Sequence, residues 1–183
     1  IIQKVDVIIH LAARVHVMRT SNKTSELKNQ IYANYEITRN LVEQAIAHGV
    51  KRFIYLSTIK VNGENTLGDS FDHNSKLQPI GEYAVSKALA EKEIINLSNS
   101  AKMEYVIIRP PMVYGDTTRG NMFRLAKLIL KGYPLPLAGI NNRRSIISVR
   151  NLSEFIKLCV YSPHAKNRIF PISDEEKVST STL

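Results

Sequence analysis

Short apolar runs alternate along this chain with longer segments in which apolar residues recur at helical spacing. The runs are rich in β-branched residues, which favours strands, and they occupy residues 5–11, 53–57, 102–109, 144–149 and 168–172. The segments of helical period occupy residues 31–48, 83–97, 121–131 and 151–161. Strands and helices that alternate at these lengths predict right-handed crossovers and a mostly parallel sheet.

Details of the pattern refine this picture. The first run, residues 5–11, is almost continuously apolar, which is typical of a parallel strand that is buried on both faces. Residues 18–29 are polar and are expected to form a loop or a ragged helix. Residues 63–81 are rich in Gly, Asn, Asp and Ser and predict a long loop, a feature that is often functional. Pro110 and Pro111 stop the third strand.

Composition bounds the class of protein. The 183 residues make one domain's worth of chain, and 44% hydrophobic with 22% charged residues is ordinary for a globular protein. The formal net charge is +9, but the basic residues are scattered and form no stripe with interleaved aromatic residues. This argues against nucleic-acid binding and is compatible with a phosphate-bearing ligand. The apolar start is too short for a membrane span, so we expect no membrane association.

Cysteine and histidine usage narrows the chemistry. Cys159 is the single cysteine, which argues against a disulfide framework and a cysteine metal site. It falls on the apolar face of a predicted helix, where we expect a core thiol. The five histidines show no metal-ligand spacing, so we expect no metal. The cytoplasm is the default compartment for such a chain.

The candidate chemistry lies in Tyr83 and Lys87. They are four residues apart at the start of a predicted helix and therefore share one helix face. A free Tyr has a pKa of about 10 and a free Lys a pKa of about 10.4. A nearby ammonium favours the phenolate, so Lys87 is expected to lower the pKa of Tyr83. Thr58, at the end of a predicted strand, could share the substrate oxygen. The alternative is a surface helix that carries both residues by chance.

Small residues follow the first predicted strand. Ala12 and Ala13 stand at its carboxyl end, the edge at which open α/β sheets bind ligands, and small side chains let a ligand approach the backbone there. The alternative is close packing of the following helix.

Six motifs, in this order, resemble those of the extended short-chain dehydrogenase/reductases, in the branch of NAD-dependent nucleotide-sugar epimerases and dehydratases that includes the UDP-glucose 4-epimerase-like proteins. The motifs are His10-Leu11-Ala12-Ala13, Asn34 to Leu41, Tyr55 to Gly63, Tyr83 to Lys87, Arg109 to Gly115 and Arg143 to Val149. The glycine-rich strand-turn-helix with which this family cradles the dinucleotide pyrophosphate has no counterpart in these residues. We expect that cradle outside the 183 residues, and we expect this chain alone to be inactive.

The resemblance implies an α/β fold, namely a Rossmann-like three-layer parallel sheet that is incomplete here, with part of a small C-terminal substrate domain. The dinucleotide-binding domain would take residues 1–115 and about 151–172. The nucleotide-sugar-binding domain would take residues 116–150 and 173–183.

The resemblance also implies roles for individual residues. Tyr83 would be the active-site acid or base, Lys87 would hold the nicotinamide ribose, and Thr58 would hydrogen-bond the reacting sugar oxygen. The residues expected at the cofactor are Leu11, Ala12, Ala13, Asn34, Ser57, Tyr83, Lys87 and Pro110. Those expected at the substrate are Thr58, Met112 and Arg144, the last as a bidentate partner of the pyrophosphate.

Several of these positions keep an alternative. Asn34 could make a structural hydrogen bond within its helix instead of touching a ligand, and Arg144 could make a surface salt bridge. Some relatives carry Asn where Met112 stands and Asp where Arg150 stands, so those two positions depart from the family pattern.

The activity implied is NAD-dependent epimerisation of a nucleotide-activated sugar, an isomerase reaction of the UDP-hexose 4-epimerase kind that uses oxidoreductase chemistry. NADP is left open as the cofactor. The family's 4,6-dehydratases carry Asp-Glu directly after the active-site Thr, whereas Ile59-Lys60 follow Thr58 here, which argues against dehydration. A reductase of a 4-keto-6-deoxy sugar nucleotide and a catalytically silent dinucleotide-binding sensor stay open.

The setting of the reaction follows from the same resemblance. The segment from residue 134 to residue 152 is similar to bacterial surface-polysaccharide enzymes, which places the activity in polysaccharide biosynthesis. The partner expected is the nucleotide-sugar substrate. Because the strand at residues 5–11 would keep an unpaired edge, we also expect a homodimer.

Overall fold

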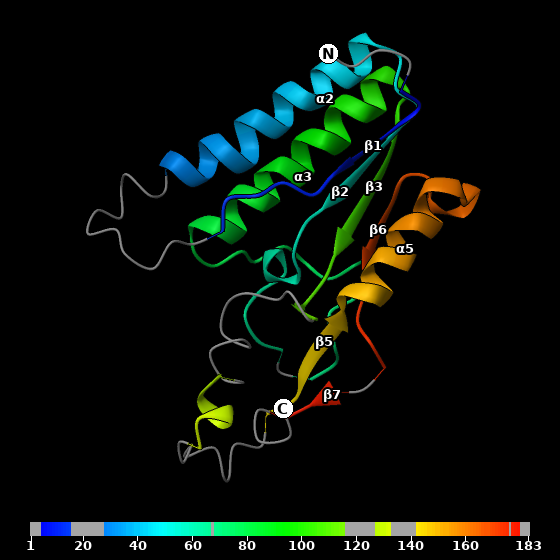
Figure 1. The fold of residues 1–183 in the computed structure, drawn as a ribbon. Helices are drawn as coiled ribbons and strands as arrows, with labels where there is room; N and C mark the ends of the chain where they lie inside the picture. Colours follow the sequence, from blue (N-terminus) through cyan, green and yellow to red (C-terminus); the bar gives the residue numbers. More distant parts are fainter. Residues whose placement is uncertain are drawn as a thin grey trace.

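The computed structural model describes residues 5–15, 28–66, 68–115, 127–132, 142–175 and 177–179. A four-stranded sheet in the order β1-β2-β3-β6 forms its centre, and all three strand pairings are parallel (Figure 1). The strands are β1 (Val7–His10), β2 (Arg52–Leu56), β3 (Glu104–Arg109) and β6 (Arg168–Pro171). This confirms the predicted α/β class and the parallel sheet.

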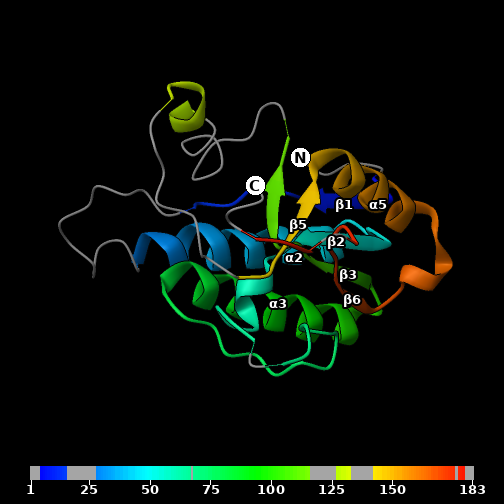
Figure 2. The same ribbon diagram turned by 90° about the horizontal axis from the view of Figure 1, so that it is seen from below.

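Helices cover both faces of the sheet, α2 (Ile37–Ala47) and α3 (Glu82–Ala101) on one side and α5 (Val149–Tyr161) on the other (Figures 1 and 2). Side chains alternate along each strand, so neighbouring residues enter opposite cores. Phe53 and Tyr55 join the core beneath α2 and α3, whereas Ile54 joins the core beneath α5. Each helix therefore buries its apolar face against the same three-layer framework.

A second, smaller sheet follows the carboxyl end of β3. It consists of β4 (Met112–Tyr114), β5 (Arg144–Ser148) and β7 (Lys177–Val178), in that order. Asp174 ties it together, because its carboxylate accepts hydrogen bonds from the Tyr114 hydroxyl (3.0 Å), the Ser148 amide (3.0 Å) and the Asn151 side chain (2.7 Å). Ser148 also caps α5 by accepting from the Asn151 amide at 3.0 Å.

Differences from the predicted elements have physical reasons. β1 was expected to be buried on both faces, but it lies at the edge of the described sheet and Ile9 is 43% exposed. The predicted helix from residue 31 contains a π-helical turn, Tyr32–Glu36, before α2. β4 was not predicted, because three residues after a Pro pair carry too little periodicity. Of the predicted helix at residues 121–131, only 127–131 lie within the described residues.

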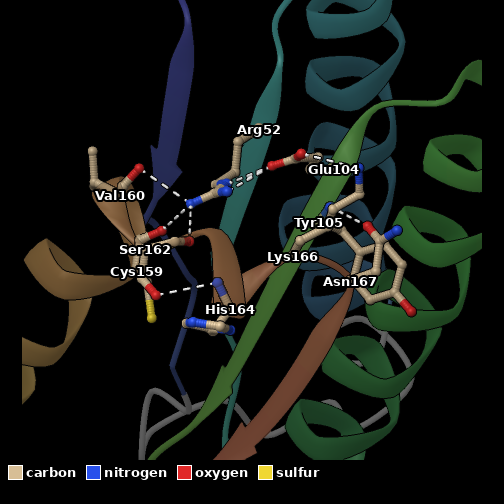
Figure 3. Close-up of polar contacts among 9 residues, drawn as sticks. All are labelled: Arg52, Glu104, Tyr105, Cys159, Val160, Ser162, His164, Lys166 and Asn167. Carbon is tan, nitrogen blue, oxygen red and sulfur yellow. Dashed lines mark hydrogen bonds and ion pairs between the residues drawn. The ribbon is translucent and has the colours of Figure 1, made fainter.

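Arg52 joins three elements at the amino-terminal end of β2 (Figure 3). Its guanidinium donates to the Glu104 carboxylate of β3 at 2.7 and 2.9 Å. On the other side it donates to carbonyls at the end of α5, those of Cys159 (2.6 Å), Val160 (3.2 Å) and Ser162 (2.9 Å). A helix ends in carbonyls without intrahelical partners, and a buried cation satisfies them. Arg52 therefore fixes α5 to the sheet.

The described residues bear on three further expectations, which concern the cysteine, a membrane span and a metal site. Cys159 is buried, and burial raises the pKa of its thiol to about 11, which confirms a core thiol. None of the described helices is long and apolar enough to cross a membrane. Within the same ranges, no group of three or more His, Cys, Asp and Glu side chains is arranged to hold a metal ion.

Replacement of Arg52 tests this clamp. Arg52→Met leaves three carbonyls without their donor and leaves Glu104 with Lys166 as its only ionic partner among the described residues, so we expect the free energy of unfolding to fall by about 3 kcal/mol. Lys51→Met is the matched control, because the neighbouring Lys51 pairs with Asp6 on an exposed surface, where an ion pair contributes less than about 1 kcal/mol. Urea unfolding followed by circular dichroism measures both. Equal losses in the two variants would contradict the assigned role of Arg52.

Candidate active site

The residues expected to carry chemistry gather at the carboxyl ends of the parallel strands. Residues 11–13 follow β1, Ser57 and Thr58 follow β2, and Pro110 follows β3. Parallel strands end at one edge of their sheet, so these segments meet there. Backbone hydrogen bonds join the segments at the ends of β2 and β3: the Ser57 amide donates to the Ile108 carbonyl at 2.8 Å, and the Ile59 amide donates to the Pro110 carbonyl at 2.9 Å.

Lys87 enters this edge from α3 and is only 1% exposed. Its ammonium donates to the Leu56 carbonyl at 2.6 Å and stands 4.1 Å from the centre of the Tyr55 ring. The carbonyl and the ring face supply the negative partners that a buried cation requires. Burial nevertheless lowers the pKa of Lys87 to about 7, against a smaller raising effect from Glu91. The predicted surface alternative for Lys87 is therefore wrong.

Tyr83 lies one turn before Lys87 and is half-buried. Burial raises the pKa of its phenol. This corrects the expectation that Lys87 lowers the pKa of Tyr83. The physical reason is that the Lys87 ammonium is directed at the Leu56 carbonyl, and desolvation disfavours the phenolate. In this structure Tyr83 therefore holds its proton.

Thr58 and Ser57 occupy the turn after β2. Thr58 is the N-cap of a short 3₁₀ turn, Ile59–Val61, and its hydroxyl accepts from the Lys60 amide at 3.3 Å. The Ser57 hydroxyl has no hydrogen-bond partner among the described residues, and the residue is only 4% exposed. A buried polar group without a partner calls for an explanation, and a bound ligand at this edge would supply one. Ser57 therefore fits the expected cofactor contact.

Asn34 holds the segment that follows β1. Its side-chain oxygen accepts from the Arg14 amide at 2.7 Å, and its amide nitrogen donates to the Arg14 carbonyl at 3.0 Å. The same nitrogen lies 2.8 Å from Gln30 Oε1 and 3.0 Å from Ser86 Oγ of α3. Protein groups engage both the oxygen and the nitrogen of the Asn34 side chain, and Asn34 is buried, so this geometry supports the structural alternative. Asn34 lies in the π-helical turn, and its side-chain amide sits between the segment that follows β1 and helix α3.

The other expected residues lie at two places. Leu11, Ala12 and Ala13 are exposed after the carboxyl end of β1, and the small side chains of Ala12 and Ala13 leave the backbone there accessible. Met112 begins β4 and Arg144 begins β5, so both belong to the second sheet, and the side chain of Arg144 is exposed. Figure 1 shows β5 beyond the carboxyl ends of β2 and β3.

The sequence reasoning missed two side chains that surround Lys87. Tyr55 carries the ring below the ammonium, and His10 stacks on Tyr55 with ring centres 5.5 Å apart. His10 also shares a 2.8 Å hydrogen bond with the Thr38 hydroxyl of α2. Burial, with a further contribution from Lys87, lowers the pKa of His10 to about 4, so its ring is neutral near pH 7. Tyr55 and His10 each begin one of the six family motifs, and their place in those motifs was the sequence signal that could have identified them.

The lowered pKa of Lys87 has a measurable consequence. Between about pH 7 and pH 10.5 the unfolded chain binds one more proton at this position than the folded chain, so this group adds stability as the pH rises. Lys87→Met abolishes that titration. We expect the free energy of unfolding of the variant, relative to wild type, to fall by about 1.4 kcal/mol for each pH unit from pH 7 to pH 9. Urea unfolding at several pH values measures it.

Lys92→Met is the matched control for this titration, because Lys92 is an exposed lysine of the same helix. Its stability relative to wild type is expected to stay constant over the same pH range. A constant difference for Lys87→Met would show that Lys87 keeps an ordinary pKa.

The chain is similar to known sugar 4-epimerases. A UDP-glucose 4-epimerase of Vibrio cholerae is 43% identical over 179 residues, which is 97% of this chain and 54% of that protein. A 4-epimerase of N-acetyl-α-D-glucosaminyl-diphospho-ditrans,octacis-undecaprenol from Escherichia coli O157:H7 is 30% identical over 152 residues, 82% of this chain and 45% of that protein. The chain thus spans about half the length of the curated relatives it matches.

Solved structures share the fold. The UDP-glucuronic acid 4-epimerase of Bacillus cereus, in complex with UDP-glucuronic acid and NAD, superposes with a TM-score of 0.85 at 23% identity, over 97% of this chain and 56% of that chain. The dTDP-glucose 4,6-dehydratase DesIV of Streptomyces venezuelae, with NAD bound, gives a TM-score of 0.83 at 25% identity, over 98% of this chain and 55% of that chain. These likenesses confirm the Rossmann-like architecture.

A family model matches nearly the whole sequence. The model of the NAD dependent epimerase/dehydratase family matches residues 1–172, which includes every candidate site residue named above. The chain belongs to the NAD-dependent epimerase/dehydratase family of enzymes.

Proposed function

We propose that this chain is part of an NAD-dependent 4-epimerase of a nucleotide-activated sugar. The observation that carries the proposal is the burial of Lys87 between the Leu56 carbonyl and the Tyr55 ring, one helical turn after Tyr83 and at the strand end that bears Thr58. The 43% identity to a UDP-glucose 4-epimerase supports it. So does the resemblance of the six motifs.

The roles follow from what each side chain can do. Tyr83 can accept the proton of a sugar hydroxyl only as the phenolate, so it must first lose its own proton, and it returns a proton when the keto group is reduced. The buried cation of Lys87 favours that phenolate. Thr58 offers a hydroxyl donor to the same sugar oxygen. The two ionisations are coupled, because a phenolate at Tyr83 would in turn favour the charged form of Lys87.

The residues present fit a bound NAD. Ser57 offers a buried hydroxyl that no other described residue binds, and Ala12 and Ala13 leave the backbone accessible. With Leu11, Lys87 and Pro110 they would hold the nicotinamide end, and NADP is the alternative cofactor. When bound, the nicotinamide supplies the hydride acceptor and donor of the reaction. Asn34 would act on this site through the backbone of Arg14.

The substrate side is also a proposal. Met112 and Arg144 are assigned to the nucleotide-sugar because β4 and β5 lie beyond the carboxyl ends of the parallel strands. Residues 116–150 and 173–183 would form the sugar-nucleotide domain, and residues 1–115 with about 151–172 the dinucleotide domain. A cytoplasmic enzyme of polysaccharide biosynthesis is the setting that we propose.

A 4-keto sugar-nucleotide reductase is the second candidate, because the same three side chains serve one-way hydride transfer. Dehydration is disfavoured, since the position after Thr58 holds Ile59-Lys60 and the Lys60 ammonium pairs with Glu64 at 3.0 Å. A silent sensor is disfavoured because both Tyr83 and Lys87 are kept.

Turnover by the full-length enzyme tests the function. A UDP-hexose that is converted to its 4-epimer with cofactor retained on the protein supports the epimerase, and stoichiometric consumption of NAD(P)H supports the reductase. Tyr83→Phe is expected to lower kcat by roughly 10² to 10⁴. Tyr161→Phe, at an exposed position on α5, is the matched control and keeps full activity. Binding of cofactor without any turnover would favour the silent sensor.

The proposed homodimer has its own test. β1 is at the edge of the described sheet, so its outer backbone groups have no strand partner among the described residues, and we propose that a second chain pairs there. We expect light scattering coupled to size-exclusion chromatography to give twice the mass of this 183-residue chain. A monomer at micromolar concentration would contradict the proposal.

A further inference from the structure

A buried ion pair lies beside the active site and is not explained by the roles assigned so far. Arg109, the last residue of β3, and Glu91 of α3 are 3% and 1% exposed. The Arg109 guanidinium donates to the Glu91 carboxylate through Nη2 at 2.6 Å and through Nε at 3.1 and 3.2 Å. The pair therefore joins the carboxyl end of the sheet to the helix that carries Tyr83 and Lys87.

The third arm of Arg109 reaches the turn that begins with Thr58. Its Nη1 donates to Asn62 Oδ1 at 3.2 Å, and Asn62 is the residue that ends the 3₁₀ turn Ile59–Val61. The Asn62 amide nitrogen donates in turn to the Ser75 carbonyl at 2.9 Å. One buried network thus holds α3, the end of β3 and the Thr58 turn in a single arrangement.

Glu91 stands one turn after Lys87, which itself stands one turn after Tyr83, so the three share one side of α3. A shift of α3 along its axis would move all three together relative to Thr58. A buried ion pair is weak evidence for stability, because a well-packed apolar pair of similar volume often serves as well. The directional hydrogen bonds of the Glu91–Arg109 pair are better explained by a need to keep α3 and Thr58 at a fixed spacing.

We propose that Glu91, Arg109 and Asn62 are positioning residues, which lock α3 and the Thr58 turn together so that Thr58, Tyr83 and Lys87 keep the spacing that proton transfer requires. The inference rests on the proposed function. Reacting groups tolerate little misplacement, and an ångström of displacement can lower a rate about a hundredfold.

The network also acts on the charge of Lys87. The groups that face Lys87 are His10 from β1, the Tyr55 ring and Leu56 carbonyl from β2, and Glu91 from α3 itself. Among them the Glu91 carboxylate raises the pKa of Lys87. Loss of the Glu91 carboxylate therefore lowers the pKa of Lys87, so Lys87 loses its proton and its charge at a lower pH.

The test uses the full-length enzyme and the double variant Glu91→Leu/Arg109→Met, which replaces the ion pair by apolar side chains. We expect it to fold with kcat lowered about tenfold or more, with little change in KM, and with the alkaline limb of the kcat profile moved to lower pH. Glu104→Gln, which weakens the Arg52 ion pair at the opposite end of the sheet, is the structural control. It is expected to lower the Tm and leave kcat and its pH profile unchanged.

A double variant with wild-type kcat and pH profile would overturn the proposal. If that variant does not fold, Asn62→Ala decides, because it keeps the ion pair and removes the hydrogen bonds of Asn62 to Arg109 and to the Ser75 carbonyl. An unchanged kcat overturns the proposal, and a reduced kcat at constant KM supports it. If wild type turns over no sugar nucleotide, the proposed function fails. The NMR titration of Lys87 in the double variant, which lacks the Glu91 carboxylate, then tests the network by itself, and an unchanged Lys87 titration there overturns it.

Discussion

The site depends on the burial of one cation. Lys87 is almost fully enclosed, and a buried ammonium is stable only where other groups face it. The Leu56 carbonyl and the Tyr55 ring come from β2, and Glu91 comes from α3. Even so, burial moves the pKa of Lys87 to about 7, so the fold holds a group whose charge is poised near neutrality. Such a group is costly for stability and useful for proton chemistry.

Two arginines hold the ends of the same sheet, and they serve different purposes. Arg52 closes the amino-terminal end by binding Glu104 and the last carbonyls of α5, which fixes a helix on the face away from the site. Arg109 closes the carboxyl-terminal end by binding Glu91 and Asn62, which fixes the helix and the turn that carry the chemistry. Stability and positioning are therefore separable by mutation in this fold.

Much of the framework was predictable, since strands β1, β2, β3 and β6 and helices α2, α3 and α5 all form close to the positions that periodicity indicated. Periodicity works here because each element is long enough to repeat its pattern several times. It failed for β4, which has three residues, and for the exposure of Ile9, which depends on the absence of a neighbouring strand among the described residues. Neither property is recorded in local sequence.

The amino-acid sequence alone determined the α/β framework, the family motifs and the spacing that puts Tyr83 and Lys87 on one face of a helix. It did not determine their ionisation, because a pKa depends on burial and on neighbours that come from distant segments. The tertiary structure raises the pKa of Tyr83, where the motif alone led us to expect a lower one, and it turns Lys87 toward the Leu56 carbonyl. It also assigns Asn34 to the backbone of Arg14, twenty residues away, and joins Glu91, Arg109 and Asn62 into one network. These contacts arise only when separate strands and helices pack together.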